Sequence, residues 1–213
     1  MKFLAFLSVF FSITFLCASL GAQANMDSGL YDPAPPEGSA FVRFINASGA
    51  EGAEKSGANG KGYMRLKNRE ISPYFVVKQG TADVSFGALK HSFEVKAGKF
   101  YTVVWAEDLS IIEDETNDNR AKSQILFYNL SARETLTLKT SDGSVAIVEN
   151  VGKGMSGVRQ INPVKIEAAV YEGDTKITDI EPLSLERGMA YSAIIFADSD
   201  DVVWVRSETN TIN

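Results

Sequence analysis

Histidine and cysteine are almost absent from this chain. The 213 residues include one histidine, His91, and one cysteine, Cys17. Nucleophilic triads and most protein zinc sites are built around histidine or cysteine, so either kind of chemistry has few residues to draw on. A single cysteine has no partner, which excludes a disulfide framework within the chain.

A basic stripe is also missing. Lysine and arginine number 21 against 27 aspartates and glutamates, and the formal net charge is −6. Nucleic acid and anionic membrane surfaces are therefore poor partners. The most acidic stretch, Glu-Asp-Glu-Thr-Asn-Asp-Asn-Arg-Ala at residues 113–121, is polar and has no aliphatic periodicity.

The N-terminus has the pattern of a secretory leader. An apolar run over residues 3–20 is followed by Ala-Gln-Ala at residues 22–24, the small-x-small pattern of a signal peptidase site. We expect cleavage before Asn25 and export to the periplasm. Because Cys17 lies within the leader, the mature chain would have no cysteine and would depend on hydrophobic cores for stability.

No segment carries a helical stripe of useful length. Short segments rich in Phe, Tyr, Val and Ile alternate instead with Gly, Asn and Ser clusters, which predicts strands. The expected strands are residues 40–47, 62–66, 74–78, 83–88, 91–96, 99–106 and 109–112, then 123–130, 135–140, 144–149, 164–171, 175–179, 189–197 and 202–206. Residues 140–143 and 171–175 are expected to form hairpin turns, because Asp and Gly adopt the required backbone conformations.

We predict an all-β fold with two tandem β-sandwich domains, Ig-like or jelly-roll-like, joined by a short polar linker. The predicted divisions are a signal peptide at 1–24, a proline-rich extended lead-in at 25–39, an N-terminal sandwich at 40–112, an acidic linker at 113–121 and a C-terminal sandwich at 122–213. The glycine-rich residues 51–61 and 151–160 are expected to be long loops.

An internal repeat supports the two-domain prediction. Phe-Val-Arg-Phe-Ile-Asn-Ala-Ser at residues 41–48 returns 83 positions later as Gln-Ile-Leu-Phe-Tyr-Asn-Leu-Ser at residues 124–131. Ile-Ser-Pro at residues 71–73 returns 90 positions later as Ile-Asn-Pro at residues 161–163, and the same offset relates Gly98 and Tyr101 to Gly188 and Tyr191. The change of offset predicts an insertion within residues 142–157 of the second copy. Such a repeat favours a modular protein over one built around a single catalytic pocket.

Candidate catalytic groups are few. His91 alternates with Phe93 and Val95, which is typical of a half-buried strand histidine. Gly-Asp-Thr at residues 173–175 is similar to the Gly-Asp-Ser nucleophile block of SGNH-type esterases, but no Asp-x-x-His follows it. We interpret it as a hairpin turn.

The remaining polar and aromatic motifs have structural interpretations as well. Asp-Ser-Asp-Asp at residues 198–201 lacks the spaced acids of a calcium loop, so an acidic turn is favoured over a weak calcium site. Asn46 and Asn129 each begin an Asn-x-Ser glycosylation pattern, but an asparagine that stabilises a turn at a strand end explains both. Trp105 and Trp204 each follow a Val-Val pair, and core packing is favoured over an exposed platform. The sequence identifies no catalytic residue, no cofactor-binding residue and no metal ligand.

Nine segments in both halves of the chain match one known family in the same order: residues 29–33, 38–43, 46–48, 129–131, 136–143, 159–165, 169–174, 183–188 and 203–205. Through these segments, most densely in the second half, the chain resembles AlgF, the periplasmic alginate O-acetylation protein family. The linker at 113–121 departs from the family pattern because it lacks prolines.

The resemblance implies a secreted accessory protein of two β-sandwich domains that is required to acetylate mannuronate residues of alginate. Its implied partners are SGNH-like acetyltransferases and an MBOAT-type membrane acyltransferase, and no catalytic residues carry over. The favoured function is a non-catalytic adaptor that docks these components and aids acetyl relay, with no cofactor. Two alternatives stay open: a polysaccharide-binding module and a serine-dependent acetyltransferase or acetyl carrier. Their candidate residues are Trp105, Trp204, Tyr74 and Tyr101 for sugar stacking, and His91 as the base.

Overall fold

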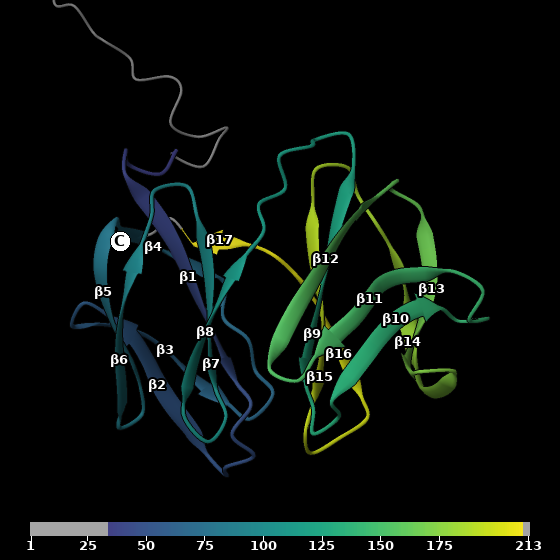
Figure 1. Cartoon of the computed structure of the whole chain (residues 1–213). Coiled ribbons are helices and arrows are strands. Elements are labelled where there is room, and N and C mark those ends of the chain that lie inside the picture. Colours follow the sequence, from purple (N-terminus) through teal and green to yellow (C-terminus); the bar gives the residue numbers. More distant parts are fainter. Residues whose placement is uncertain (1–33, 211–213) are drawn as a thin grey trace, which may run out of the picture. The chain divides into compact units, whose positions relative to one another are not determined.

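Residues 34–210 are described by a computed structural model, and all of their regular structure is β (Figure 1). The predicted leader at 1–24 and residues 25–33 of the predicted lead-in lie outside the described residues, as do residues 211–213. Within residues 34–210 no helix is long and apolar enough to cross a membrane.

The first sandwich consists of sheet A, with strand order β17-β4-β1-β7-β8, and sheet B, with order β3-β2-β5-β6. Its strands are β1 (Ser39–Asn46), β2 (Ala53–Ala58), β3 (Lys61–Lys67), β4 (Tyr74–Lys78), β5 (Gly80–Phe86), β6 (Leu89–Val95), β7 (Phe100–Trp105) and β8 (Leu109–Asp114). The first two residues of the segment predicted as a linker, 113–121, therefore belong to β8.

The second sandwich consists of sheet C, with order β12-β9-β15-β16, and sheet D, with order β11-β10-β13-β14. Its strands are β9 (Ser123–Leu130), β10 (Thr135–Thr140), β11 (Ala146–Gly152), β12 (Met155–Ile161), β13 (Lys165–Glu172), β14 (Thr175–Ser184), β15 (Ala190–Phe196) and β16 (Val202–Arg206). The last strand, β17 (Thr209–Asn210), leaves this sandwich and pairs in parallel with β4 of the first. The predicted all-β class with two tandem sandwiches is confirmed.

Three hydrophobic cores hold the four sheets. One lies between sheets A and B and contains Phe44, Phe86 and Leu66. Another lies between sheets C and D and contains Phe127 and Leu138. The third joins sheet A to sheet C, so the central strands of these two sheets are buried on both faces; its buried members are Ile45, Val104, Leu126, Tyr128, Ile194 and Phe196.

The sequence repeat corresponds to a structural repeat in the central strands. β1 pairs in parallel with β7 and β9 pairs in parallel with β15, with Val42 opposite Tyr101 and Ile125 opposite Tyr191. Each tyrosine hydroxyl accepts a hydrogen bond from a backbone N–H five residues earlier, at 3.1 Å from Lys96 and 3.2 Å in the second copy.

The two strand-end asparagines also behave alike, and the predicted side-chain-stabilised turn is confirmed in both copies. Asn46 Oδ1 accepts hydrogen bonds from the backbone N–H and the hydroxyl of Ser48, at 3.1 and 2.7 Å. Asn129 Oδ1 accepts the same two bonds from Ser131, at 3.2 and 2.6 Å. The asparagines are therefore turn residues of the fold.

One part of the predicted repeat is wrong. Residues 71–73 precede β4, whereas residues 161–163 end β12 and lead into β13. The register on the central strands makes Val77 the counterpart of Ile161, because Val77 lies opposite Ala40 and Ile161 lies opposite Ser123. The offset at β12 is therefore 84, only one more than in the first segment, so the shift to 90 does not arise within residues 142–157. The β10–β11 connection is longer than the β2–β3 connection, but the β11–β12 connection is shorter than the β3–β4 connection. The extra residues of the second copy lie in the longer β13–β14 hairpin.

Both predicted glycine-rich loops contain strands instead. Residues 51–61 include β2, which pairs with β3 and β5 at the centre of sheet B. A Cβ on Gly57 would lie 2.5 Å from the carbonyl oxygen of Lys61, so this glycine permits close strand approach. Residues 151–160 include most of β12, and a Cβ on Gly157 would lie 2.6 Å from Val148 Cγ1. Glycine at both positions reflects tight packing and not mobility.

The predicted hairpin turns are confirmed. β10 and β11 are joined through Asp142 and Gly143, and β13 and β14 are joined through Gly173 and Asp174. Gly173 has a φ of 59°, as the first loop position of a two-residue type II′ hairpin requires. Hydrogen bonds from Thr140 and Ser144 hold the pKa of the exposed Asp142 carboxyl at about 2.

Asn129→Leu is expected to destabilise the protein by about 3 kcal/mol, because each lost buried hydrogen bond costs on the order of 1 kcal/mol. The amide of Asn129 also donates to the carbonyl oxygens of Arg133 and Val151, at 2.9 and 3.1 Å, and these would lose their partner. Urea unfolding measures the change. The control Asn162→Leu, at an exposed position, should change stability by less than about 0.5 kcal/mol; equal losses for the two variants would contradict this account.

Candidate functional site

A buried arginine lies where sheets A and C meet. Arg43 projects from the middle of β1 and is 1% exposed. Its Nε donates to Thr102 Oγ1 at 2.9 Å, and its Nη2 donates to Tyr128 at 2.7 Å and to Ser192 Oγ at 2.9 Å. The guanidinium also lies 4.6 Å from the ring centroid of Tyr74. One side chain therefore links strands of both sandwiches.

The counter-charge is Asp114, at the end of β8, which is 2% exposed. Its carboxylate accepts hydrogen bonds from the hydroxyls of Tyr74, at 2.7 Å, Thr102 and Tyr128. A buried carboxylate with three hydroxyl donors and a nearby guanidinium is fully compensated. We call these residues, Arg43, Tyr74, Thr102, Asp114 and Tyr128, the Arg43 network.

The electrostatics of the Arg43 network keep its arginine and its two tyrosines in one protonation state. Burial alone lowers the pKa of Arg43, but interactions with Tyr128, Tyr74 and Asp114 outweigh burial and raise it. Burial is the largest cause of the raised pKa values of Tyr74 and Tyr128, and the attraction of Arg43 does not cancel it. At neutral pH both tyrosines stay protonated, so neither acts as a base.

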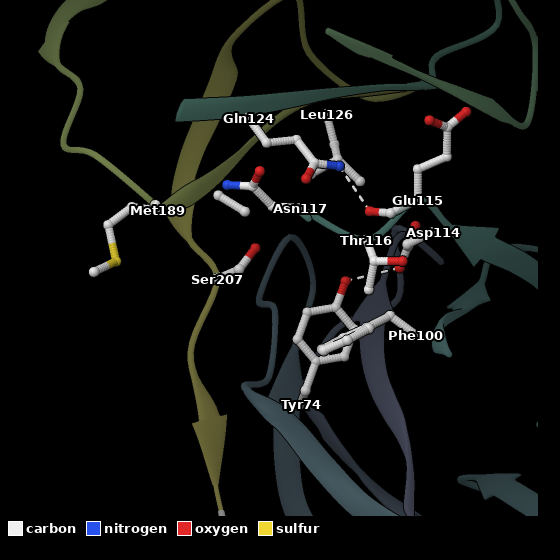
Figure 2. Close-up of a pocket in the computed structure, with 12 residues that line it drawn as sticks. Tyr74, Phe100, Asp114, Glu115, Thr116, Asn117, Gln124, Leu126, Met189 and Ser207 are labelled. Carbon is white, nitrogen blue, oxygen red and sulfur yellow. Dashed lines mark hydrogen bonds between the residues drawn. The ribbon is translucent and has the colours of Figure 1, made fainter. Parts of the chain in front are cut away.

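Beside this network lies a cavity of about 230 Å³. Tyr74, Phe100 and Asp114 line it from sheet A, and residues 115–117 line it from the segment after β8 (Figure 2). The second sandwich contributes Gln124, Leu126, Gly188, Met189, Ala190 and Ser207. The cavity is thus lined by both sandwiches.

Polar groups without partners converge on this cavity. Among residues 34–210, the buried side-chain atoms that lack a hydrogen bond within the protein are Nδ2 and Oδ1 of Asn117, Oε1 of Gln124 and Oγ of Ser207. All belong to cavity-lining residues, and Figure 2 shows the three side chains around the same space. Gln124 is 1% exposed and is oriented by its Nε2, which donates to the backbone oxygen of Glu115 at 2.7 Å. Each unpaired buried group costs about 1–3 kcal/mol, so four such atoms at one place are unusual for a purely structural region.

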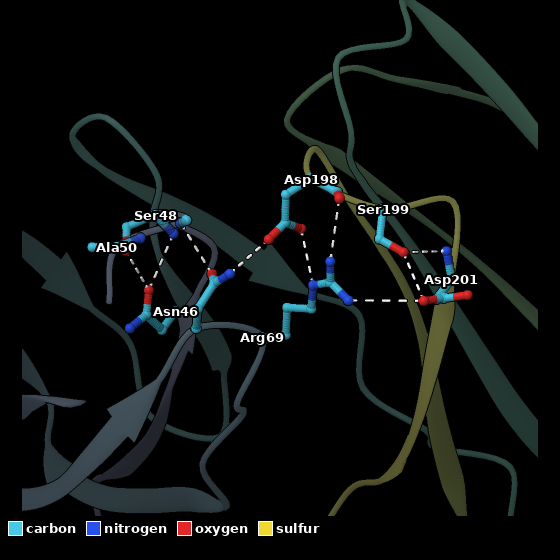
Figure 3. Close-up of polar contacts among 9 residues, drawn as sticks. Asn46, Ser48, Ala50, Arg69, Asp198, Ser199 and Asp201 are labelled. Atoms are coloured by element: carbon cyan, nitrogen blue, oxygen red, sulfur yellow. Dashed lines mark hydrogen bonds and ion pairs between the residues drawn. The ribbon is translucent and has the colours of Figure 1, made fainter. Parts of the chain in front are cut away.

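A second contact between the sandwiches involves the acidic turn at residues 198–201. Arg69 Nε lies 2.9 Å from Asp198 Oδ1, and its Nη1 lies 3.8 Å from Asp201 Oδ2 (Figure 3). Asn68 Nδ2 donates to Asp198 Oδ2 at 2.7 Å. The turn was expected to be merely acidic and solvated. It instead forms ion pairs with the β3–β4 turn of the other sandwich, which give the carboxylates of Asp198 and Asp201 a counter-charge.

Partial burial alone would raise the pKa of Asp198, but hydrogen bonds from Arg69 and Asn68 outweigh burial and lower it. The carboxylate is therefore charged in the folded state over the whole neutral range. Within residues 34–210, no group of three or more His, Cys, Asp or Glu side chains is placed to hold a metal ion.

The other sequence candidates are dispersed. His91 lies in β6 as expected, but its side chain is exposed and not half-buried; its ring centroid lies 6.4 Å from that of Phe93. The ring centroids of Trp105 and Phe86 lie 5.1 Å apart in the first core, and Trp204 packs against the second core. The prediction of core packing is therefore confirmed. Tyr74 and Tyr101 are buried. The aromatic residues considered for sugar stacking are thus committed to the fold.

Sequence reasoning missed the residues that form this site. The Arg43 network and the unpaired groups Asn117, Gln124 and Ser207 carry no motif. One signal was available: Arg43 interrupts an apolar run at residues 40–45, and an arginine there is rarely buried without a dedicated partner.

These features define a class: a two-sandwich β-protein with a buried charge network and an adjoining cavity between the sandwiches. The family model described as "Alginate O-acetyl transferase AlgF" matches residues 12–192, and the chain belongs to this family.

Two sequence relatives support the assignment. The "Alginate biosynthesis protein AlgF" of Pseudomonas syringae pv. tomato is 35% identical over 202 residues, covering 91% of this chain and 87% of the relative. The protein of the same name from Pseudomonas aeruginosa is 30% identical over 193 residues, covering 89% and 88%. A solved structure of the C-terminal domain of AlgF from P. aeruginosa is 36% identical, covers 40% of this chain and 98% of that chain, and has a TM-score of 0.37.

Arg43→Met is expected to lower the free energy of unfolding by about 3–5 kcal/mol, because it leaves the Asp114 carboxylate buried without its counter-charge. Adding Asp114→Asn should restore part of the loss, since that change removes the uncompensated charge. A double-mutant cycle by urea unfolding measures the coupling. Arg206→Met, at an exposed position, is the control and should cost less than about 1 kcal/mol. Strict additivity of the two buried substitutions would contradict the assignment.

The Asp198 contact predicts a pH-dependent contribution to stability. A lowered folded-state pKa stabilises the protein above the unfolded pKa of about 4, and this stabilisation is lost as the pH falls through the folded value. Because Arg69 and Asp198 are 33% and 39% exposed, we expect Asp198→Asn to cost only about 0.5 kcal/mol at pH 7. The difference from wild type should shrink below about pH 4. Asp108→Asn, in the exposed β7–β8 turn, is the control, and a difference that grows in acid would contradict the prediction.

Proposed function

We propose that this protein is a non-catalytic adaptor required for O-acetylation of alginate. In this role it acts in the periplasm, after cleavage before Asn25, and docks SGNH-like acetyltransferases and the MBOAT-type membrane acyltransferase. Family membership supports the pathway, because the relatives are named alginate biosynthesis proteins. The adaptor role rests on one observation: within residues 34–210, no nucleophile lies beside a base in the manner of an acyltransferase site.

The chemistry of the described residues favours docking over catalysis. The single histidine is exposed on an outer sheet, and no hydrogen bond to a serine is found for it within residues 34–210. The buried hydroxyls of Tyr74 and Tyr128 have raised pKa values, and Thr102 donates to a carboxylate. These three hydroxyls share one acceptor, the Asp114 carboxylate, which also compensates Arg43, so the network holds them as structural donors.

The way the sandwiches are joined supports a rigid docking platform. A shared core and the Arg43 network lie between sheets A and C, which leaves sheets B and D on the outside (Figure 1). Their edge strands include β6 and the ten-residue β14. Free strand edges are common docking surfaces, because they offer unpaired backbone groups to a partner strand.

Direct binding tests this proposal. Purified mature protein should bind at least one alginate acetyltransferase in calorimetry, with a defined stoichiometry, and deletion of the gene should abolish polymer acetylation. His91→Ala should restore acetylation as fully as wild type in the deletion strain. Loss of acetylation with His91→Ala, at unchanged protein level, would favour an enzyme. Failure to bind any acetyltransferase, singly or in mixtures, would remove the adaptor role.

A further inference from the structure

We infer that the cavity beside the Arg43 network is a binding site for an uncharged residue of a partner polypeptide. This inference rests on the proposed function, because it assigns a docking position to the adaptor. The observation behind the inference does not depend on family membership: the unpaired buried side-chain atoms of the described residues all belong to residues that line this one cavity.

The charges around the cavity exclude an anionic occupant. No lysine or arginine lines the space. The carboxylate of Asp114 is already compensated by the Arg43 network, and Glu115 is exposed and contributes its backbone oxygen. A carboxylate or phosphate would lose its hydration without gaining a counter-charge. A uronic acid polymer carries one carboxylate on every sugar ring, so it is a poor occupant.

The unpaired groups match a peptide group. Asn117 offers two N–H donors on Nδ2 and an acceptor on Oδ1, so its side-chain amide can pair with the C=O and the N–H of one peptide unit. Gln124 Oε1 is an acceptor for a second N–H, and Ser207 Oγ either donates or accepts. The remaining walls are apolar, with Phe100, Leu126 and Ala190 beside the polar groups.

The size of the cavity limits the occupant to about one residue. Its volume of about 230 Å³ is below the roughly 300–1,000 Å³ of sites for drug-sized ligands. Small anchor pockets of this kind, with water excluded around them, hold the central residues of protein interfaces.

The surroundings also indicate the residues that flank the anchor. Beside the cavity, Glu115 and Asp118 carry exposed carboxylates, whereas Asp114 is compensated by the Arg43 network and Glu113 pairs with Lys99 at 3.1 Å. A segment with a small uncharged residue between lysines or arginines would gain attraction at the mouth and keep an uncharged group inside. The occupant is therefore a basic peptide segment with an uncharged anchor.

A phage-displayed random heptapeptide library, panned against the full mature chain, tests the inference. We expect enriched sequences with lysine or arginine on both sides of a small uncharged residue. A synthetic peptide of the consensus sequence should shift the side-chain amide signals of Asn117 and Gln124 in NMR spectra. Its affinity should fall as salt is raised, because the flanking attraction is screened.

Asn117→Leu and Ser207→Ala provide the decisive comparison. Each should weaken peptide binding at least tenfold and leave the melting temperature unchanged or raised, because it removes an unpaired buried group. Gln79→Leu, at an exposed position between β4 and β5, is the control and should bind like wild type. A lowered melting temperature in both cavity variants would indicate a structural role and overturn the inference.

Three other results would also overturn it: no enriched sequence, enriched peptides whose affinity is unchanged by Asn117→Leu, or mannuronate oligomers that shift the same amide signals. The cavity inference and the adaptor proposal can be refuted independently of each other. If acetyltransferases bind the cavity variants as tightly as wild type, the cavity inference fails and the adaptor stands. If no acetyltransferase binds but the peptide does, the adaptor role fails.

Discussion

The burial of one positive charge between two sheets organises this molecule. Arg43 reaches groups on β7, β9 and β15, and Asp114 fixes the end of β8 against the same cluster. A buried ion pair adds little net stability over an apolar pair of the same shape, but removing one partner is costly. The network therefore specifies how the two sandwiches pack together. The two charges are satisfied in only one arrangement, and every misaligned arrangement leaves a charge without a partner.

The cavity is a consequence of that arrangement. Because Asp114 is held inside, the three residues that follow it must leave the interface along its edge, and they form one wall of the space. Gly188 forms another part; its φ of 73° lies in the left-handed region that favours glycine, so the β14–β15 connection turns here without strain. Rigid walls lower the entropic cost of binding, since little of the protein needs to be ordered when a partner arrives.

Much of the fold follows from the sequence, but most of the junction between sheets A and C does not. Period-two segments such as those of β5 and β10 identify strands because one face packs and the other is more exposed. β2 and β12 were missed because Gly57 and Gly157 suggest mobility, whereas contacts from distant residues make small side chains necessary there. β1, β9 and β15 are buried along nearly their whole length, as strands covered on both faces are. Their largely apolar sequences are the signal that could have indicated a third core. Nothing local marks Asn117 or Ser207, because their importance comes from what the rest of the chain places around them.

The repeat explains why the junction is formed by the central strands and why it is asymmetric. The pairing registers make Thr102 equivalent to Ser192, Val104 equivalent to Ile194, and Ile45 equivalent to Tyr128. All six contribute to the junction, so the copies meet through equivalent surfaces, as two subunits do across a two-fold axis. Such symmetry would juxtapose identical residues near the axis.

Two arginines in this interior would repel each other, and two leucines would leave Asp114 without a counter-charge. The chain has Arg43 in one copy and Leu126 in the other, which places a single positive charge in the network and an apolar side chain on the cavity wall. A single chain can keep this difference, whereas identical subunits cannot. The junction is therefore where duplication has allowed the two copies to specialise.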